Sequence, residues 1–381
     1  MRRVRAAVAE APGAPFAVRD ADLEEPRPSE VLVRMEATGL CHTDLAMRDT
    51  WPRELTPMVF GHEGAGRVEA VGAEVTSVAA GDRVCLTFAS CGACDQCVAD
   101  HPAYCRAARA RNLSGGRHDG TTPLSLDGAP LHAGFFGQSS FATYAVVHER
   151  GAVKVPSDLP SAVVAPLGCS GQTGAGAVLN RLRPAPGSSL VVLGAGGVGL
   201  SALMAAVAVG CDPVVAVDPV ASRRALAVEL GAMTALAPGE GLVAALRDLT
   251  GGGAHHVVET TGRPETVRRA VSALRPRGEI VLLGLGGEVT FDVMGLLSKG
   301  VHVHGVIEGD SDPGRFLPEL IGLHRRGLFP IGRLVTTFPF EEIGAAVAAM
   351  ADGSAVKPVL TFVGRPRFPA RRGRHRGRRD R

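Results

Sequence analysis

The chain has 381 residues, 45% of them hydrophobic, and a formal net charge of +3 at pH 7. This length predicts two domains with a substantial core, so disulfide staples are not needed for stability. The basic opening, MRRVRAAVAEAPGAPF, has no uninterrupted apolar run, which argues against a secretory leader and favours a reducing, cytoplasmic location.

The first half of the chain predicts an irregular all-β unit. Short β-like runs such as EVLVRMEATGL, EGAGRVEAVG, GDRVCLTF and FATYAVV are separated by Gly and Pro. Three residues there are candidate metal ligands: Cys41 in GLCHTD, His62 in GHEGAGRVEAVGAEV and Cys169 in LGCSGQTGAG. Two thiolates and one imidazole leave a fourth zinc position open, as catalytic sites do. Taken singly, each cysteine can be a core residue and the histidine a turn residue.

Four more cysteines lie in the stretch FASCGACDQCVADHPAYC, namely Cys91, Cys94, Cys97 and Cys105. Disulfides, a redox pair, an iron–sulfur cluster or a metal clip would each use such thiols. A reducing compartment favours metal over disulfides, and the spacing differs from that of a ferredoxin-type cluster.

From about Gly171 the pattern changes to alternating strands and helices. Strands LVVLG, PVVAVD, HHVVETTG and GEIVLLG alternate with helical stretches such as SRRALAVELGA and PETVRRAVSALR, which predicts a parallel sheet in an α/β fold. The uncharged stretch 184–211 is long enough to cross a bilayer, but its glycine cluster predicts a buried strand, turn and helix instead. We therefore expect no membrane partner.

A glycine fingerprint follows the first of these strands. In VVLGAGGVGL, Gly194 allows a tight turn, Gly196 admits a pyrophosphate and Gly199 lets helix and strand pack closely. The next strand ends in Asp218, which can accept from the ribose hydroxyls of NAD and would repel the 2′-phosphate of NADP. Arg223, like Arg224, is near enough in sequence to reverse that preference.

The last part of the chain predicts two helices, RFLPELIGLHRRG and FEEIGAAVAAMADG, and a final strand, KPVLTFV. Residues 365–381 hold nine Arg and one Asp, a charge of +8, so the remaining 364 residues carry −5. Such a composition predicts disorder. The segment is either a non-functional extension or a tether for nucleic acid or another acidic surface.

Together these motifs resemble those of the zinc-dependent medium-chain alcohol dehydrogenases over about residues 5 to 364. GHEGAGRVEAVGAEV resembles the family's catalytic zinc signature, the four-cysteine stretch its structural zinc lobe, and GAGGVG with Asp218 its NAD site. FFGQSSFATYAVVHERGAVKVP and APLGCSGQTGAGAVLN look most like the bacterial branch that contains benzyl alcohol and geraniol dehydrogenases.

The resemblance implies a GroES-like irregular β catalytic domain over residues 1–170, with the structural-zinc lobe at about 85–115. It implies a doubly wound Rossmann NAD domain over 171–306 and a return segment over 307–364 that completes the catalytic domain. The expected disordered tail is then 365–381. The family is typically dimeric or tetrameric, so we expect a homodimer or homotetramer.

Two zinc ions per chain follow from the resemblance, a catalytic ion on Cys41, His62 and Cys169 and a structural ion on the four clustered cysteines. Glu63 would ligate the catalytic zinc transiently during water exchange, and Asp44 would orient His62. The alcohol oxygen would occupy the open zinc position while a hydride passes to NAD, with Thr43 accepting the alcohol proton. The implied cofactor site consists of His42, Thr173, Gly194, Gly196, Gly197, Val198, Gly199, Asp218, Arg223 and Lys357.

Within it, Thr173 and Val198 would flank the nicotinamide, and His42 and Lys357 would meet the pyrophosphate. One departure is Ala46, where animal members have a histidine that passes the proton to solvent. Apolar residues near the family's pocket positions suit an aryl or allylic group, although each can equally be core: Trp51, Phe88, Leu113, Phe135 and Phe136.

We therefore expect NAD-dependent, reversible oxidation of primary aryl or allylic alcohols to aldehydes. One alternative is a thiol-dependent formaldehyde dehydrogenase of the same superfamily, which would need a polar, often basic pocket rim. Another is a zinc-clip nucleic-acid binder that uses the arginine-rich segment; it leaves the dinucleotide motif and the second ligand set unexplained.

Overall fold

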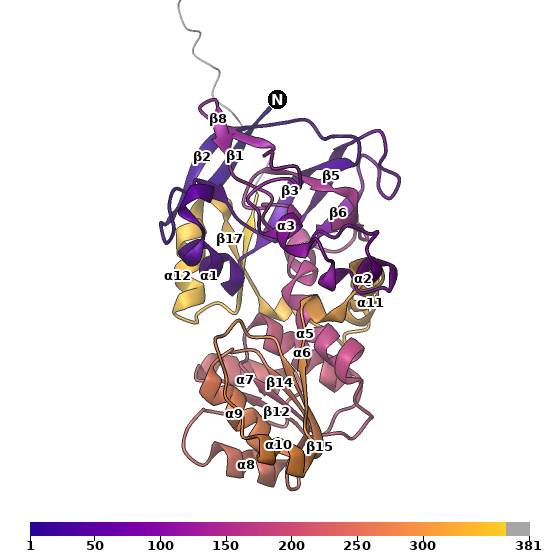
Figure 1. Cartoon of the computed structure of the whole chain (residues 1–381), viewed down its shortest axis with the longest axis vertical. Coiled ribbons are helices and arrows are strands. Elements are labelled where there is room, and N and C mark those ends of the chain that lie inside the picture. The colour runs from indigo at the N-terminus through magenta and orange to yellow at the C-terminus, as the bar shows by residue number, and fades with distance from the viewer. Residues whose placement is uncertain (363–381) are drawn as a thin grey trace, which may run out of the picture.

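The computed structural model describes residues 1–362, so the expected boundary at Gly364 and the arginine-rich segment lie outside the described part of the chain. Within residues 1–362 there are three sheets. Two antiparallel-rich sheets form one half of the molecule and a parallel sheet forms the other (Figure 1).

The first sheet has the strand order β4–β1–β2–β7–β8 and is antiparallel throughout. In β1, Val4, Ala6, Ala7 and Val8 are buried. The strand bounds are β1 Arg2–Ala9, β2 Phe16–Leu23, β4 Met58–Val59, β7 Leu124–Leu126 and β8 Ala129–Leu131.

The second sheet has the order β10–β6–β5–β3–β18–β17, and β9 also pairs with β3. Its strands are β3 Glu30–Gly39, β5 Glu63–Val71, β6 Arg83–Leu86, β9 Tyr144–His148, β10 Ala152–Lys154, β17 Val335–Pro339 and β18 Lys357–Thr361. Because Gly39 of β3 pairs with Val359 of β18, the end of the described chain returns to the N-terminal half. That return brings Lys357 beside residues more than 290 positions away.

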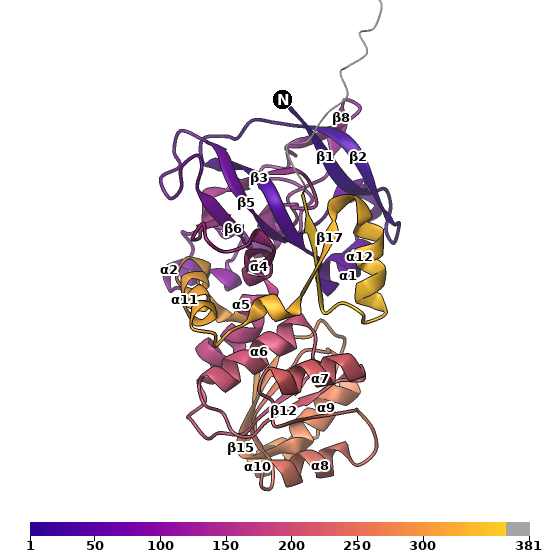
Figure 2. The same ribbon diagram turned by 180° about the vertical axis from the view of Figure 1, so that it is seen from behind.

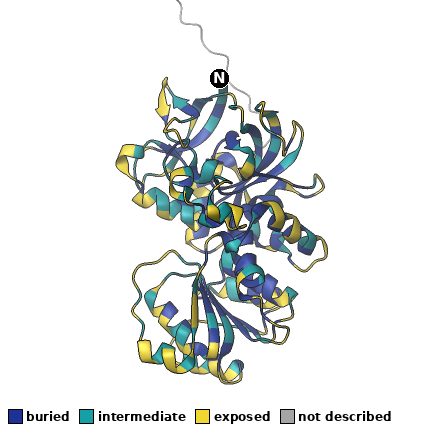
Figure 3. Cartoon of the chain, turned by 45° about the vertical axis from the view of Figure 1, so that its right-hand side comes forward, coloured by how far each residue is buried: buried dark blue, intermediate teal, exposed yellow. Residues whose placement is uncertain are grey.

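The third sheet is parallel, with the order β13–β12–β11–β14–β15–β16. This is the doubly wound order in which ligands bind beyond the carboxyl ends of the strands. Its bounds are β11 Leu190–Leu193, β12 Val214–Val217, β13 Thr234–Leu236, β14 Ala254–Glu259, β15 Leu274–Leu282 and β16 His302–Gly305. Helices cover both faces, which is why the central strands LVVL and VVAV are wholly buried (Figure 3).

The α-helices of the described residues are α1 His42–Thr50, α2 Asp95–Val98, α3 Ala108–Asn112, α4 Ser161–Val164, α5 Ser170–Gly176, α6 Gly197–Ala208, α7 Ala221–Glu229, α8 Leu242–Leu249, α9 Pro264–Ala273, α10 Val293–Lys299, α11 Pro313–Arg325 and α12 Ile343–Ala351. Both α5 and α6 lie where the two halves of the molecule meet (Figures 1 and 2). Their backbones touch closely, because a Cβ on Gly174 would come within 2.0 Å of the Val198 carbonyl oxygen.

The sequence prediction was right about the irregular β half, the alternating half and the strand–turn–helix of the uncharged stretch. It missed the short outer strands β13 and β16 and the helices α8 and α10. Among residues 1–362 no single helix is long and apolar enough to cross a membrane. One bent helix pair, Ser161–Gly168 with Ser170–Leu182, has the length and composition of a membrane span.

Candidate active site

Four buried residues, Cys41, His62, Glu63 and Cys169, form the chamber cluster. One ligand atom from each lies within 4.8 Å of all the others. Cys41 directly precedes α1, His62 and Glu63 stand at the start of β5, and Cys169 directly precedes α5. Three separate element ends therefore bring together two thiols, an imidazole and a carboxylate.

Asp44 fixes the positions of two members of the chamber cluster. Its Oδ2 accepts the backbone N–H of Cys41 at 2.9 Å, and its Oδ1 accepts the backbone N–H of Gly61 at 3.1 Å and lies 2.8 Å from His62 Nδ1. With the proton on Nδ1, the Nε2 lone pair points into the cluster. A carboxylate behind an imidazole in this way orients metal-binding histidines in general.

The open ring nitrogen of His62 is the strongest sign of a bound cation. Nε2 is buried and has no hydrogen-bond partner among the described residues, although a buried polar atom without a partner is costly. Two thiols and a carboxylate are its neighbours, and Zn²⁺ prefers such donors. The residues present therefore fit a zinc ion.

Without a cation, the members of the cluster have strongly shifted pKa values. A hydrogen bond from Cys169 holds the pKa of Cys41 well below its usual range against the cost of burial, with help from the Lys357 charge. The same hydrogen bond and burial raise the pKa of Cys169. Burial lowers the pKa of His62, but Asp44 outweighs it and raises that pKa well above its usual value. Without a cation only one of the two thiols ionises readily; a divalent cation would stabilise both thiolates.

The Glu63 carboxylate is paired with the buried ammonium group of Lys357. Lys357 Nζ lies 2.8 and 3.0 Å from its two carboxylate oxygens and donates to the Leu40 carbonyl oxygen at 3.2 Å. Burial raises the pKa of Glu63, and the lysine charge opposes that rise. A Cβ on Gly197 would lie 3.0 Å from Lys357 Cε, so this lysine also borders the glycine turn. Lys357 thus lies between the chamber cluster and the first turn of α6.

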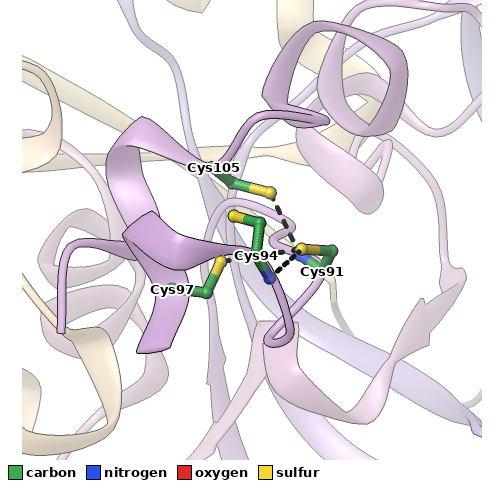
Figure 4. Close-up of side chains that lie close together, drawn as sticks. All are labelled: Cys91, Cys94, Cys97 and Cys105. Atoms are coloured by element: carbon green, nitrogen blue, oxygen red, sulfur yellow. Dashed lines mark hydrogen bonds between the residues drawn. The ribbon is translucent and has the colours of Figure 1, made fainter. Parts of the chain in front are cut away.

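The second set of thiols, Cys91, Cys94, Cys97 and Cys105, forms the lobe cluster, whose four sulfurs also lie within 4.8 Å of one another (Figure 4). All four are free thiols rather than disulfides. Backbone N–H groups of Ala93 and Cys94 lower the pKa of Cys91 to about 6, whereas burial raises the pKa of Cys97 to about 12. Four thiols make a donor set that suits zinc and leaves no open position for a substrate.

The glycine turn between β11 and α6 has the geometry that dinucleotides require. Gly194 has φ 95°, and a Cβ on Gly199 would lie 1.7 Å from the Gly194 carbonyl oxygen. Gly196 has open space around it. Asp218 is buried just past β12 and accepts backbone N–H groups of Ala195 and Val220, both at 2.8 Å. Its carboxylate thus supports the turn, and each oxygen retains a lone pair for a ligand.

The remaining expected cofactor residues lie on α1, α5, α6 and α7. His42 is exposed at the first position of α1, and Thr43 is half-buried with its Oγ1 3.7 Å from the Cys41 sulfur. Thr173 on α5 and Val198 on α6 are half-buried where the two helices touch. Arg223 on α7 has a buried Nε without a partner among the described residues. Arg224 donates to the backbone carbonyl oxygen of Asp218 and makes no bond to the Asp218 side-chain carboxylate among the described residues.

Aromatic rings cover one side of His62. The Phe136 ring stacks on the imidazole at 4.7 Å between centroids, and the Phe135 ring meets it edge-on at 5.5 Å. Trp51 packs edge-on against Phe135 and Phe60, deep in the core. Of the five apolar pocket candidates, Phe136 and Phe135 contact the chamber cluster and Trp51 packs behind them, while Phe88 is buried and Leu113 half-buried.

Three polar residues near the cluster were missed by sequence reasoning. Gln138 donates to the His62 carbonyl oxygen at 2.9 Å and accepts from the Gly64 N–H at 3.1 Å. Gln172 and Glu308 form a buried hydrogen bond of 3.0 Å. Glu308 follows β16, so the rule that ligands bind beyond the carboxyl ends of parallel strands was the signal that could have found it.

Comparison with known proteins agrees with this arrangement of fold and site. A family model described as "Alcohol dehydrogenase GroES-like domain" matches residues 27–157, and one described as "Zinc-binding dehydrogenase" matches residues 197–322. The chain therefore belongs to the zinc-dependent medium-chain alcohol dehydrogenases and is an alcohol dehydrogenase, which confirms the resemblance found in the sequence.

Three relatives illustrate the likeness. The chain is 48% identical over 364 residues to "Geraniol dehydrogenase" of Castellaniella defragrans, covering 94% of this chain and 97% of the relative. A crystal structure of benzyl alcohol dehydrogenase from Acinetobacter calcoaceticus has a TM-score of 0.92 and 42% identity, covering 95% of this chain and 100% of that one. An alcohol dehydrogenase zinc-binding domain protein from Burkholderia ambifaria has a TM-score of 0.91 and 48% identity with the same coverage.

Proposed function

We propose that this enzyme oxidises primary aryl or allylic alcohols with NAD⁺, reversibly. The alcohol carbon gives a hydride to the cofactor and the hydroxyl gives up a proton, so RCH2OH and NAD⁺ become RCHO, NADH and H⁺. The observation that best supports this is the buried Nε2 of His62, which has no partner in the described part of the chain, lies near two thiols and is covered by phenyl rings. The relatives named for geraniol and benzyl alcohol support the substrate class.

Zinc bound at the chamber cluster would supply an electrophile that favours loss of the alcohol proton. Cys41, His62 and Cys169 would hold it, and Asp44 keeps the imidazole in the tautomer that exposes Nε2. Glu63 can ligate it transiently during water exchange, while Lys357 compensates the carboxylate charge. A second zinc would bind the four thiols of the lobe cluster and serve folding alone.

Thr43 is the group that we expect to move the proton. Its Oγ1 lies beside the Cys41 sulfur, and a hydroxyl can accept one proton while donating another. Ala46 is exposed on the same helix and offers no base, so water is the next acceptor. His42, also exposed, would serve the cofactor pyrophosphate together with Lys357.

NAD would bind along the glycine turn, where Gly196 leaves room for a pyrophosphate at the start of α6. Asp218 would accept from the ribose hydroxyls and disfavour the 2′-phosphate of NADP. Arg223 on α7 has an Nε without a partner among residues 1–362 and would be available to the adenosine end.

We also propose that the enzyme is a homo-oligomer. Exposed large apolar side chains of the described residues concentrate between 285 and 307, on α10, β16 and the adjoining turns: Leu285, Val293, Met294, Leu297, Val303 and Ile307. Strand β16 is the last of its sheet, so its outer edge has no partner strand among residues 1–362. Exposed apolar side chains beside an unpaired sheet edge favour association. Static light scattering should show a dimer or tetramer that Leu297→Glu dissociates.

Steady-state kinetics test the chemistry. Benzyl alcohol or geraniol should give a higher kcat/KM than ethanol, and NAD⁺ a higher value than NADP⁺. Formaldehyde should be a substrate neither with nor without added low-molecular-weight thiols. Thiol-dependent formaldehyde oxidation without benzyl alcohol turnover would instead identify the formaldehyde dehydrogenase alternative.

A further inference from the structure

Glu308 is a buried carboxylate that the mechanism above does not use. It lies in the one-turn 3-10 helix η7, Glu308–Asp310, which follows β16. Its side chain and backbone are 7% exposed, and Glu308, Gly309 and Asp310 all have positive φ. A positive φ is costly for Glu308 and Asp310, which flank Gly309. Strained backbone of this kind persists where the surroundings impose it. Asp310 supplies the restraint, because it pairs with Tyr104 and Arg181.

Glu308 is less well satisfied than the other buried carboxyls. Only Oε2 bonds to described residues, with Gln172 Nε2 at 3.0 Å and Thr173 Oγ1 at 3.5 Å. The Gln172 amide nitrogen has two hydrogens but is also near Thr87 Oγ1 and the Gly168 carbonyl oxygen, so its support is shared. No ion pair of Glu308 is present within residues 1–362. The other buried carboxyls have several N–H donors or a lysine: Asp44, Glu63, Asp218 and Glu259.

The carboxylate contacts α5, the helix that runs from the chamber cluster to the glycine turn. Its partner Thr173 lies on α5, four residues after Cys169. Beside it, Gly174 packs against the Val198 carbonyl at the start of α6. On the other side, a Cβ on Gly309 would lie 2.1 Å from the Gln172 carbonyl oxygen, which seats η7 directly on α5. Hydride transfer would require the nicotinamide ring near both the chamber cluster and this turn, and Glu308 contacts Thr173 on the helix that links the two.

The charges of the site leave Glu308 without compensation. A divalent zinc with two thiolates is neutral, and Glu63 is neutralised by Lys357. The oxidised nicotinamide ring carries a positive charge, and the ring is neutral once it has accepted a hydride. Burial raises the pKa of Glu308 to about 7, although the charge of His62 and the bond from Gln172 oppose the rise. An adjacent cation would stabilise the ionised form.

We propose that Glu308 is the counter-charge of the oxidised nicotinamide and strengthens the binding of NAD⁺ relative to that of NADH. This inference rests on the proposed use of NAD. Its consequence is specific: removing the charge weakens binding of the oxidised cofactor alone. It also aids release of the reduced cofactor, because the neutral ring is not attracted to the carboxylate.

Calorimetric titration of the full-length, zinc-loaded enzyme at pH 8 tests this with three ligands. NAD⁺ has the charged ring, NADH the neutral ring, and ADP-ribose no nicotinamide. In Glu308→Gln, which keeps the size and the hydrogen-bond acceptor, the Kd for NAD⁺ should rise about tenfold, a usual size for coupling between partly buried charges. The Kd values for NADH and ADP-ribose should stay within about twofold. Glu319→Gln, on the exposed face of α11, is the matched control and should change none of them.

An equal rise in the Kd values for NAD⁺ and NADH would overturn the inference by showing that Glu308 has a structural role. No change in either Kd would overturn it by showing that Glu308 has no role in cofactor binding. Glu308→Asp provides a rescue test, because it keeps the charge and should keep the wild-type ratio of the NAD⁺ and NADH dissociation constants, which Glu308→Gln changes. If Glu308→Gln does not fold, the ratio of the Kd for NAD⁺ to the Kd for NADH is measured in Glu308→Ala instead. A wild-type enzyme that binds ADP-ribose and neither form of NAD would overturn the proposed cofactor itself, a result separate from either outcome at Glu308.

Discussion

The chamber cluster and the lobe cluster differ in the features that decide what a metal ion can do. The chamber cluster is wholly buried, draws on three distant element ends and mixes sulfur, nitrogen and oxygen donors. The lobe cluster comes from one short stretch, is partly exposed and offers four sulfurs (Figure 4). Four sulfur donors fill the tetrahedral positions of a zinc site, whereas three donors with a nearby carboxylate leave room for a substrate. The comparison teaches that a buried set of three donors with an open fourth position marks the reactive site.

The largest expected effect comes from breaking the chamber cluster. Cys169→Ser removes one thiol that directly precedes α5 and leaves the packing of α5 on α6 in place. We expect kcat to fall by at least about a thousandfold, because the electrophile is lost while the fold remains. Turnover assays with circular dichroism check this, and a variant with more than a tenth of wild-type activity would contradict the assignment.

Proton transfer gives the next effect. Thr43→Ala should slow hydride transfer by roughly 10²–10⁴-fold, the usual range for a positioned acid–base group. Thr43→Ser keeps the hydroxyl and should be nearly silent. Single-turnover measurements of NADH formation compare the two, and an equal loss in both would mean that Thr43 matters for packing rather than for the proton.

Sequence motifs predicted both clusters because each cysteine set, the histidine and the glycine turn carry recognisable local spacing. They did not predict Glu308 or the pairing of Lys357 with Glu63. Lys357 comes from β18, which joins the second sheet only through its pairing with β3, and Glu308 reaches Gln172 across 136 positions. Contacts made by sheet topology leave no local pattern, and β16 was missed because its four residues, HVHG, lack an apolar run.

The lobe cluster should fail in a different way. Cys94→Ser opens a four-thiol site in a segment with little core of its own, so we expect the free energy of unfolding to fall by about 4 kcal/mol or more. Denaturant titration followed by circular dichroism measures it. Ala93→Ser, next to it on the exposed side, is the control. A stable Cys94→Ser enzyme with normal zinc content would show that the lobe needs no metal.

The smallest effect concerns cofactor choice. Asp218→Gly removes a carboxylate that binds the Ala195 and Val220 N–H groups, and with it the repulsion of a 2′-phosphate. The ratio of kcat/KM for NAD⁺ to that for NADP⁺ should fall by about tenfold or more. Asp218→Asn removes the charge but keeps one acceptor oxygen, so it separates the effect of the charge from that of the hydrogen bonds. A wild-type enzyme that already prefers NADP⁺ would reverse the argument.

The central claim is that one chain holds a reactive and a structural zinc. Elemental analysis of freshly purified, active protein tests it most directly. We predict two zinc ions per wild-type chain and one per folded Cys169→Ser chain. One zinc or none in fully active wild-type protein would contradict the account.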